Sequence, residues 1–170
     1  NVFMGYKAGY TNSSGKDATI IGTKAGYSLD DGHFNIMIGS KAGYTTSSGH
    51  RNIFVGGVSA TAGTDAAGYS NTSGNDNIMI GIKAGKSATS SNNLFMGSNS
   101  SSSVISGQYN LTIGNESGVN NLGNYNTFIG HKAGQGYVGS TSTAGSIMIG
   151  YESGKLSHSD KSIYIGKNAG

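Results

Sequence analysis

Apolar residues occur along this chain in short, evenly spaced clusters, each closed by a glycine. Clusters such as residues 52–56 (Asn-Ile-Phe-Val-Gly) and 126–130 (Asn-Thr-Phe-Ile-Gly) are rich in β-branched and aromatic residues and are bounded by Gly and Ser, which is typical of strands. The closing glycines are Gly5, Gly22, Gly39, Gly56, Gly81, Gly97, Gly114, Gly130, Gly150 and Gly166. They are 16 or 17 residues apart except in two longer units of 25 and 20 residues, so the chain is an internal repeat.

This period predicts an all-β fold, a parallel β-solenoid (β-roll) of about nine to ten coils with one 16–17-residue unit in each coil. The array fills residues 1–170 as a single domain, and we interpret it as a window of a longer fibre protein. The two longer units carry residues 57–64 and 136–143. Because insertions in repeats map to loops, these segments are expected to protrude and make contacts.

Side chains on a strand alternate between two faces, so the positions on either side of the strand centre share one face. We expect these two flanking columns to form the solenoid core, with the small residues after the turn on the opposite wall. The flanking columns are Val2, Thr19, Ile36, Ile53, Ile78, Leu94, Leu111, Thr127, Ile147, Ile163 and Met4, Ile21, Ile38, Val55, Ile80, Met96, Ile113, Ile129, Ile149, Ile165. The small column is Ala8, Ala25, Ala42, Ala67, Ala84, Ser100, Ser117, Ala133 and Ser153.

The central strand position is then predicted to point outward. An exposed apolar stripe marks an interface, so we expect this central column to pack against other copies of the chain in a homotrimer or filament. Apart from Thr112, its members are Phe3, Ile20, Met37, Phe54, Met79, Phe95, Phe128, Met148 and Tyr164. The alternative is that the two faces are reversed, in which case the flanking columns need the partner.

Polar columns have structural interpretations. Asparagine precedes most strands, at positions 1, 35, 52, 77, 93, 110 and 126, and stacked amides of this kind form a ladder from coil to coil. Tyr10, Tyr27, Tyr44 and Tyr69 follow the second glycine of the first four units; stacking on one another and stacking on sugars both account for them.

Catalytic chemistry finds little support. The segment 81–87 (Gly-Ile-Lys-Ala-Gly-Lys-Ser) resembles a phosphate loop, but it has three residues between its glycines where that motif has four, and its frame recurs in every unit. His33, His50, His131 and His158 show no metal-ligand spacing and are expected to be solvated loop residues. We therefore predict no enzyme activity, no cofactor and no metal.

Charge points to one candidate contact row. The net charge is +3 and the chain has no Cys, so neither a nucleic-acid patch nor a disulfide is expected. No apolar run approaches the roughly 20 residues that span a membrane. A lysine recurs two residues after the closing glycine, at Lys7, Lys24, Lys41, Lys83 and Lys132. This row could contact a cell-surface glycan or another anionic surface, or it could be a solvated edge that discourages lateral aggregation.

The unit at 126–134, Asn-Thr-Phe-Ile-Gly-His-Lys-Ala-Gly, and its copies resemble the repeats of trimeric autotransporter adhesin heads and the Gly-rich arrays of tail-fibre-like proteins of phages and bacteria. The resemblance implies a homotrimeric β-roll, a place on the cell surface or on a virion tail fibre, and no catalytic residues. Units in the adhesin heads are a few residues shorter than these.

The function expected from these features is a rigid, self-associating and non-catalytic shaft segment of an extracellular fibre, either adhesin-like or a phage tail fibre. Two other classes fit less well. Left-handed β-helix acyltransferases use hexapeptides such as residues 38–43 (Ile-Gly-Ser-Lys-Ala-Gly), but three in each coil and with a strict period. An ice-binding solenoid would need a regular Thr array, and no column here is consistently Thr.

Overall fold

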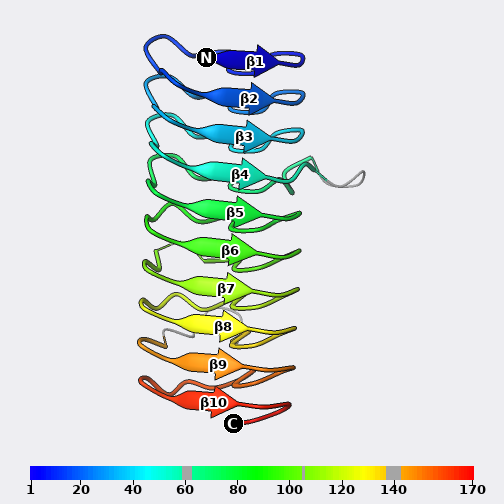
Figure 1. The fold of residues 1–170 in the computed structure, drawn as a ribbon, viewed down its shortest axis with the longest axis vertical. Helices are drawn as coiled ribbons and strands as arrows, with labels where there is room; N and C mark the ends of the chain where they lie inside the picture. The colour runs from blue at the N-terminus through cyan, green and yellow to red at the C-terminus, as the bar shows by residue number, and fades with distance from the viewer. Residues whose placement is uncertain (59–62, 105, 137–142) are drawn as a thin grey trace.

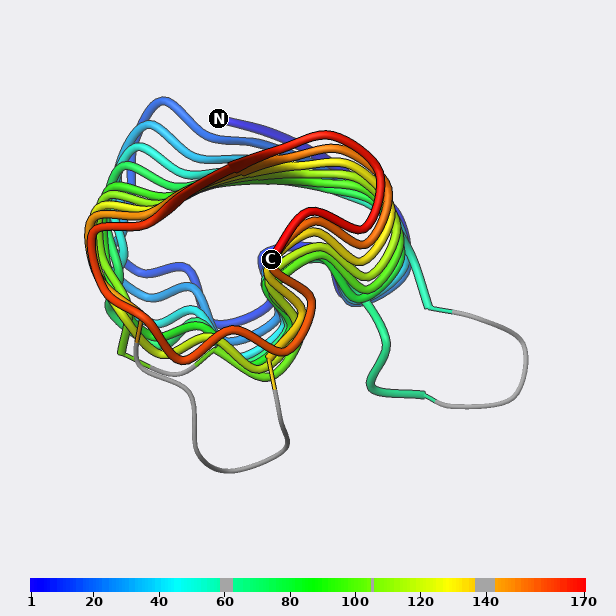
Figure 2. The same cartoon turned by 90° about the horizontal axis from the view of Figure 1, so that it is seen from below.

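The computed structural model describes residues 1–58, 63–104, 106–136 and 143–170. The chain is an all-β parallel β-solenoid with a repeat of about 17 residues, and the described residues contain no helix. Ten short strands lie one above another in sequence order, and the chain makes one circuit between each strand and the next (Figure 1, Figure 2). The strands are β1 (Val2–Met4), β2 (Thr19–Ile21), β3 (Ile36–Ile38), β4 (Ile53–Val55), β5 (Ile78–Ile80), β6 (Leu94–Met96), β7 (Leu111–Ile113), β8 (Thr127–Ile129), β9 (Ile147–Ile149) and β10 (Ile163–Ile165).

The strands form one parallel sheet in which equivalent positions of neighbouring units pair. Ile36 pairs with Ile53, for example, and Phe54 pairs with Met79. The ladder continues past the strand ends, where the Ile78 N–H donates to Asn93 O at 2.8 Å. Backbone hydrogen bonds therefore run along the rod from coil to coil, and the ten levels span about 43 Å at about 4.8 Å a step.

The closing glycine is required by the close approach of successive coils. Gly81 has φ of 127°, and a Cβ on it would lie 2.7 Å from the carbonyl oxygen of Gly97 in the next coil. L-residues rarely adopt this conformation. A side chain here would be strained and would also push two coils apart, which explains why the closing position is glycine in every unit.

The predicted orientation of the strands is wrong. Ile20, Met37, Phe54, Phe95 and their equivalents in the central column, which we expected to self-associate, point into the solenoid. From Ile20 to Met148 they are at most 2 % exposed; Phe3 and Tyr164, in the first and last coils, are more open. The affected residues are Phe3, Ile20, Met37, Phe54, Met79, Phe95, Phe128, Met148 and Tyr164.

The reason is the shape of the opposite wall. Apart from the partly buried Ala8 in the first coil, the small column is buried as predicted. It packs against the large central side chains and not against the branched ones. A Cβ on Gly68, one residue beyond Ala67, would lie 2.8 Å from the Phe54 ring. Each coil is one side chain thick, so a Phe or Met fills it from one wall to an Ala-Gly pair on the other.

The apolar interior divides into two clusters. One extends from Ala18 to Val104 and the other contains Phe128, Ala133 and Met148. Between them lies Thr112, a buried residue whose hydroxyl is 2.7 Å from Ser100 Oγ and 2.9 Å from Ser101 Oγ. The core therefore changes from apolar to hydrogen-bonded at one level of the stack.

The protruding contacts predicted for residues 57–64 and 136–143 fall mainly on residues 59–62 and 137–142, which lie outside the described residues. Within the part of the chain that is described, no helix has the length and apolar character to cross a bilayer.

Candidate functional site: an exposed apolar sheet face

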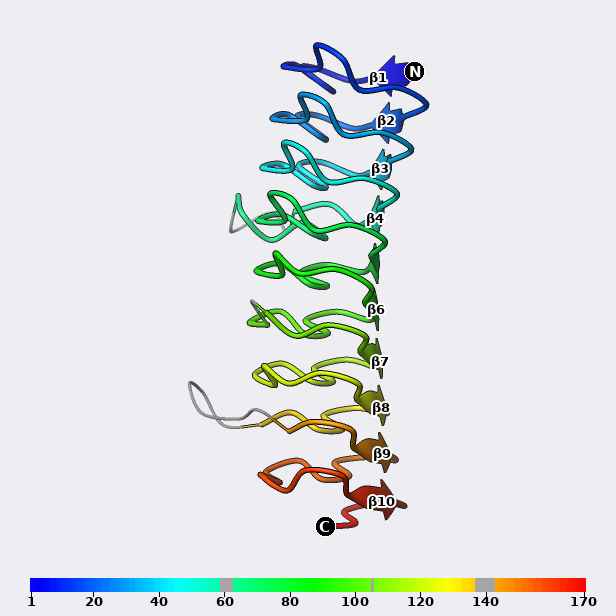
Figure 3. The same cartoon turned by 90° about the vertical axis from the view of Figure 1, so that its left-hand side faces the viewer.

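The two flanking columns form the outside of the sheet, and we call these twenty residues the outer face. None of them is buried. In coils away from both ends, Ile36, Ile38, Met96 and Ile147 remain 37–38 % exposed. All members except Thr19 and Thr127 are apolar. Figure 3 shows the strands stacked along one side of the rod, and in the end-on view of Figure 2 no other described segment covers their outer surface.

One edge of the outer face is formed by the residue that precedes each column asparagine, or that precedes Ala18, Ser146 or Ser162 where these replace the asparagine, and we call this set the corner column. Its side chains are all exposed, and the non-glycine members have φ between 53° and 62°, a left-handed conformation that suits a sharp turn but is uncommon for such residues. The members are Asp17, Phe34, Arg51, Asp76, Asn92, Tyr109, Tyr125, Gly145 and Lys161. This column was not predicted from the sequence, although Phe34, Tyr109 and Tyr125 each precede an asparagine.

A shallow depression lies where the corner column meets the outer face. Its volume is about 440 Å³, and Asp76, Asn92 and Tyr109 line it on the corner side. Ile78, Leu94 and Leu111 line it on the sheet side. The Asp76 and Asn92 side chains are short beside the Tyr109 ring, so the outer face has a recess next to an exposed aromatic side chain.

An ion pair joins two coils beside this depression. Arg51 donates to Asp76 through Nε at 2.6 Å and through Nη2 at 2.9 Å. The hydrogen bond from Arg51 lowers the pKa of the Asp76 carboxyl. Both side chains are well exposed, so the pair adds little to stability and chiefly fixes the shape of the edge.

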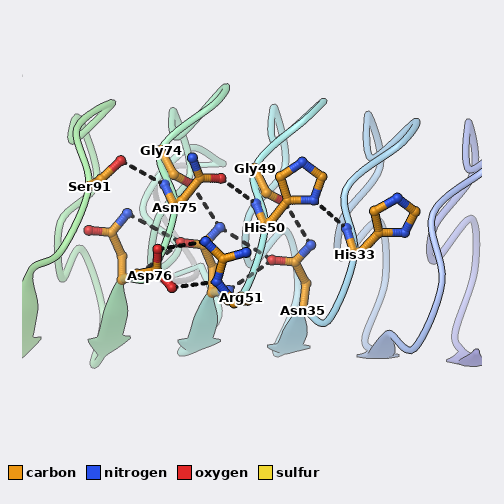
Figure 4. A network of polar contacts seen from close by, with 11 residues as sticks. His33, Asn35, Gly49, His50, Arg51, Gly74, Asn75, Asp76 and Ser91 are labelled. Carbon is orange, nitrogen blue, oxygen red and sulfur yellow. Dashed lines mark hydrogen bonds and ion pairs between the residues drawn. The ribbon is translucent and has the colours of Figure 1, made fainter.

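The predicted asparagine ladder is confirmed. Asn52 Nδ2 donates to Asn35 Oδ1 at 3.2 Å, and the same contact recurs from Asn77 to Asn52 and onward to Asn126. Each Oδ1 also accepts the backbone N–H of the next asparagine, and each Nδ2 reaches a loop carbonyl, such as Gly49 O for Asn35 at 2.7 Å. One buried amide thus links the strand, the loop and the next coil (Figure 4).

A second ladder runs beside the first and includes two histidines. His33 Nδ1 accepts the Lys16 N–H at 3.0 Å, and His50 Nδ1 accepts the His33 N–H at 2.9 Å. Asn75 and Ser91 continue the pattern in the next two coils of the chain (Figure 4). The rings of His33 and His50 stack at 5.2 Å. His33 and His50 are therefore members of this ladder and not simply solvated loop residues. The sequence feature that indicates this role is their position, two residues before a column asparagine.

The lysine row is only partly free. Lys83 Nζ is 3.4 Å from Asp65 Oδ2, Lys132 Nζ is 3.7 Å from Glu116 Oε2, and Lys41 Nζ donates to Gly63 O at 2.6 Å. Lys7 Nζ lies 4.9 Å from the Tyr10 ring centre. Lys24 is the fifth member of the row. Because the ammonium groups of the other four have contacts within the chain, the row is not a uniform line of free cations. Contact with an anionic surface remains a prediction.

The tyrosine column stacks on itself. Tyr10, Tyr27, Tyr44 and Tyr69 have ring centres 5.1–5.2 Å apart and interplanar angles of 10–14°. Burial and then the neighbouring Tyr44 raise the pKa of Tyr69. Since the inner ring faces are occupied by other tyrosines, the column presents mainly ring edges, and a sugar could not stack between them.

The phosphate-loop-like segment is a turn of the solenoid. The N–H groups of Gly81, Lys83, Gly85 and Ser87 donate to carbonyls of adjacent coils, for example Gly85 to Ser100 O at 2.9 Å. These donors are not available to a phosphate. In the described residues, no group of three or more His, Cys, Asp or Glu could hold a metal ion.

Comparison of the chain with protein-family models, with curated proteins and with solved structures gives no match.

Proposed function

We propose that this chain is a non-catalytic shaft segment of an extracellular fibre, adhesin-like, that assembles with copies of itself, with a homotrimer as the expected state. The observation that carries the proposal is the uninterrupted sheet of ten strands in sequence order, each paired in register with the next. Its repeated turns serve the backbone, as the segment around Gly81 illustrates. Such a stack supplies length and stiffness.

Stiffness follows from the direction of the hydrogen bonds. Every coil is joined to the next by strand pairing. The asparagine ladder from Asn35 to Asn126 and the acceptor ladder from His33 to Ser91 add further bonds between the coils that they cross. These bonds lie along the rod axis, so bending or stretching the rod strains many of them together. A shaft that carries a binding tip away from a surface needs this property.

The shaft of a phage tail fibre is the second candidate, because it requires the same rod. An ice-binding surface fits less well, since the outer face offers hydroxyl groups only at Thr19 and Thr127. The lysine row is the segment's predicted contact with a glycan or another anionic surface, and attachment through it would be weak at each coil and multivalent along the rod.

The experiment is to measure the shape and mass of the purified 170-residue chain. Sedimentation velocity combined with small-angle scattering should give a particle about 43 Å long along the rod axis, from ten levels at about 4.8 Å. Negative-stain images of a longer chain containing the array should show a straight segment. Images of the longer chain without a straight segment, or a near-spherical particle with the mass of one chain, would contradict the proposal.

A further inference from the structure

The outer face is a large apolar area to leave exposed to water. Its two columns run the full height of the rod and lie about 7 Å apart across the strand. With side-chain width included, this is a strip of about 43 by 12 Å, or about 500 Å², which is near the upper end of the largest apolar patches on monomers. Including the corner column and the residues after the closing glycine, such as Tyr6, Ile82 and Tyr151 (42–64 % exposed), brings the area to about 800 Å², the amount that one partner buries in a standard interface.

The composition of the outer face indicates the chemistry of its partner. No charged residue lies on the outer face, and Thr19 and Thr127 are its only side chains with hydrogen-bonding groups. A nucleic acid or a charged polysaccharide would lose solvation on this face without gaining ion pairs or hydrogen bonds. The partner must therefore be apolar.

The spacing of the outer face fits another copy of itself. Side chains repeat in register at every coil, which gives ridges and grooves with a period of about 4.8 Å. Two such faces have the same period over their whole length, so their side chains can interdigitate as they do between stacked sheets. An unrelated apolar surface would match only by chance.

The edges of the outer face also suit self-association. The exposed ring of Phe34, which is 56 % exposed, and the depression between Asp76 and Tyr109 lie along the same corner column. An interface between identical chains needs both a projection and a recess on one surface. The charges of this column, Asp17, Arg51, Asp76 and Lys161, are mixed in sign, so two copies meet without large repulsion.

We propose that the outer face is a self-association surface, covered in solution by the outer face of another copy of this chain. This inference rests on the proposed function, since it says which surface joins the rods, and it replaces the buried central column as the contact. The two-column width of the strip allows two copies to cover each other directly, and three copies to place their strips around a common axis.

The test places lysines at the centre of the outer face of the full 170-residue chain. Ile78→Lys with Leu94→Lys introduces two charges on adjacent coils beside the depression. The matched control is Ser73→Lys with Ser106→Lys, which adds the same charge at exposed positions away from the strands. Light scattering after gel filtration and sedimentation equilibrium then give the mass and the association constant of each protein.

The unaltered chain should be an oligomer at micromolar concentration. The Ile78/Leu94 variant should associate at least about 100-fold more weakly, as expected when charges are buried at the centre of an interface. The Ser73/Ser106 control should match the unaltered chain. Circular dichroism confirms that each protein is folded. If the lysine variant unfolds, Ile78→Thr with Leu94→Thr replaces it, because threonine already occupies this column at Thr19 and Thr127.

Two results would overturn the inference. One is an unaltered chain that stays monomeric at all concentrations. The other is an oligomer that the outer-face variants weaken no more than the control does. Either result leaves the shaft proposal standing if images of the longer chain show a straight segment, whereas images without such a segment reject the shaft itself. The shape measurement and the mass measurement thus test the two proposals separately.

Discussion

The asparagine ladder offers the sharpest test of how the coils are held together, and Asn77 is its most informative member. It lies in a central coil and is fully buried. Its Nδ2 donates to Ser90 O at 2.8 Å and to Asn52 Oδ1 at 3.2 Å, while its Oδ1 accepts the Asn93 N–H at 3.0 Å and Asn93 Nδ2 at 3.3 Å. Replacing Asn77 by Ala removes all four contacts, although Asn93 Nδ2 keeps Gly107 O as an acceptor at 2.9 Å.

The cost can be worked out group by group. Asn52 Oδ1 keeps the backbone N–H of residue 77, so it remains satisfied. The buried Asn93 N–H loses its acceptor, which costs about 1–3 kcal/mol, and the partly buried Ser90 carbonyl loses its donor at about 1 kcal/mol. Asn77→Ala should therefore lower the free energy of unfolding by about 2–4 kcal/mol.

Serine is the matched control, because the chain already uses it in this column. Ser146 Oγ donates to Ser159 O and accepts the Ser162 N–H, both at 3.2 Å, and so performs both tasks of the amide. Asn77→Ser should cost about 1 kcal/mol or less. Urea unfolding followed by circular dichroism and by tyrosine fluorescence, at one protein concentration, gives both values. Equal losses for Ala and Ser, or a loss below about 0.5 kcal/mol for Ala, would refute the ladder argument.

Three further predictions concern the interior and the tyrosine stack. Both polar side-chain atoms of Asn71 are buried and have no hydrogen-bond partner in the described part of the chain. Asn71→Leu, which copies Leu29 in the same column, should therefore raise the free energy of unfolding in urea by about 1–3 kcal/mol. A loss of stability would mean that the amide is hydrogen-bonded in solution. Thr112→Phe alone should lower the free energy of unfolding by about 1–3 kcal/mol, through overpacking and the loss of a hydroxyl contact. Adding Ser101→Gly should recover most of this loss, and a double-mutant cycle measures the recovery as a coupling energy. Additive effects of the two substitutions would disprove the contact. Burial raises the pKa of Tyr69, so the contribution of Tyr69 to stability is complete below the unfolded pKa of about 10 and falls as the pH rises through the folded pKa. NMR titration of labelled tyrosine rings should show one ring that ionises at higher pH than the others. That signal should disappear in Tyr69→Phe.

Much of the fold follows from the sequence because the repeat itself is informative. Strands such as Ile36–Ile38 lie where the apolar clusters place them, since only a parallel stack aligns units of equal length. The asparagine ladder follows for the same reason: identical residues at one position of each coil lie above one another. Register in a solenoid is thus readable directly from the spacing of the glycines.

The orientation of the strands could not be read from the apolar pattern, because both faces are apolar. The decisive signal is the match between Thr112 and the residues that face it on the opposite wall. Where this central residue is polar, the facing positions become Ser100 and Ser101 instead of Ala and Gly, and their hydroxyls bond to Thr112. Such a compensating change marks residues that touch, so it identifies the central column as the inner one. The flanking columns show no comparable change.

The formation of each coil does not by itself explain why the outer face is apolar. Strand formation is satisfied by β-branched residues whether they are polar or not, and β2 and β8 form with Thr19 and Thr127 on the outer face. Threonine at the other positions would support the same strands and expose less apolar surface to water. Apolar residues nevertheless fill nearly all of these positions while remaining one-third or more exposed at Ile36 and Ile147. The sequence therefore carries a hydrophobic surface that the isolated rod does not use, and covering that surface with a second rod gives its apolar residues a structural role.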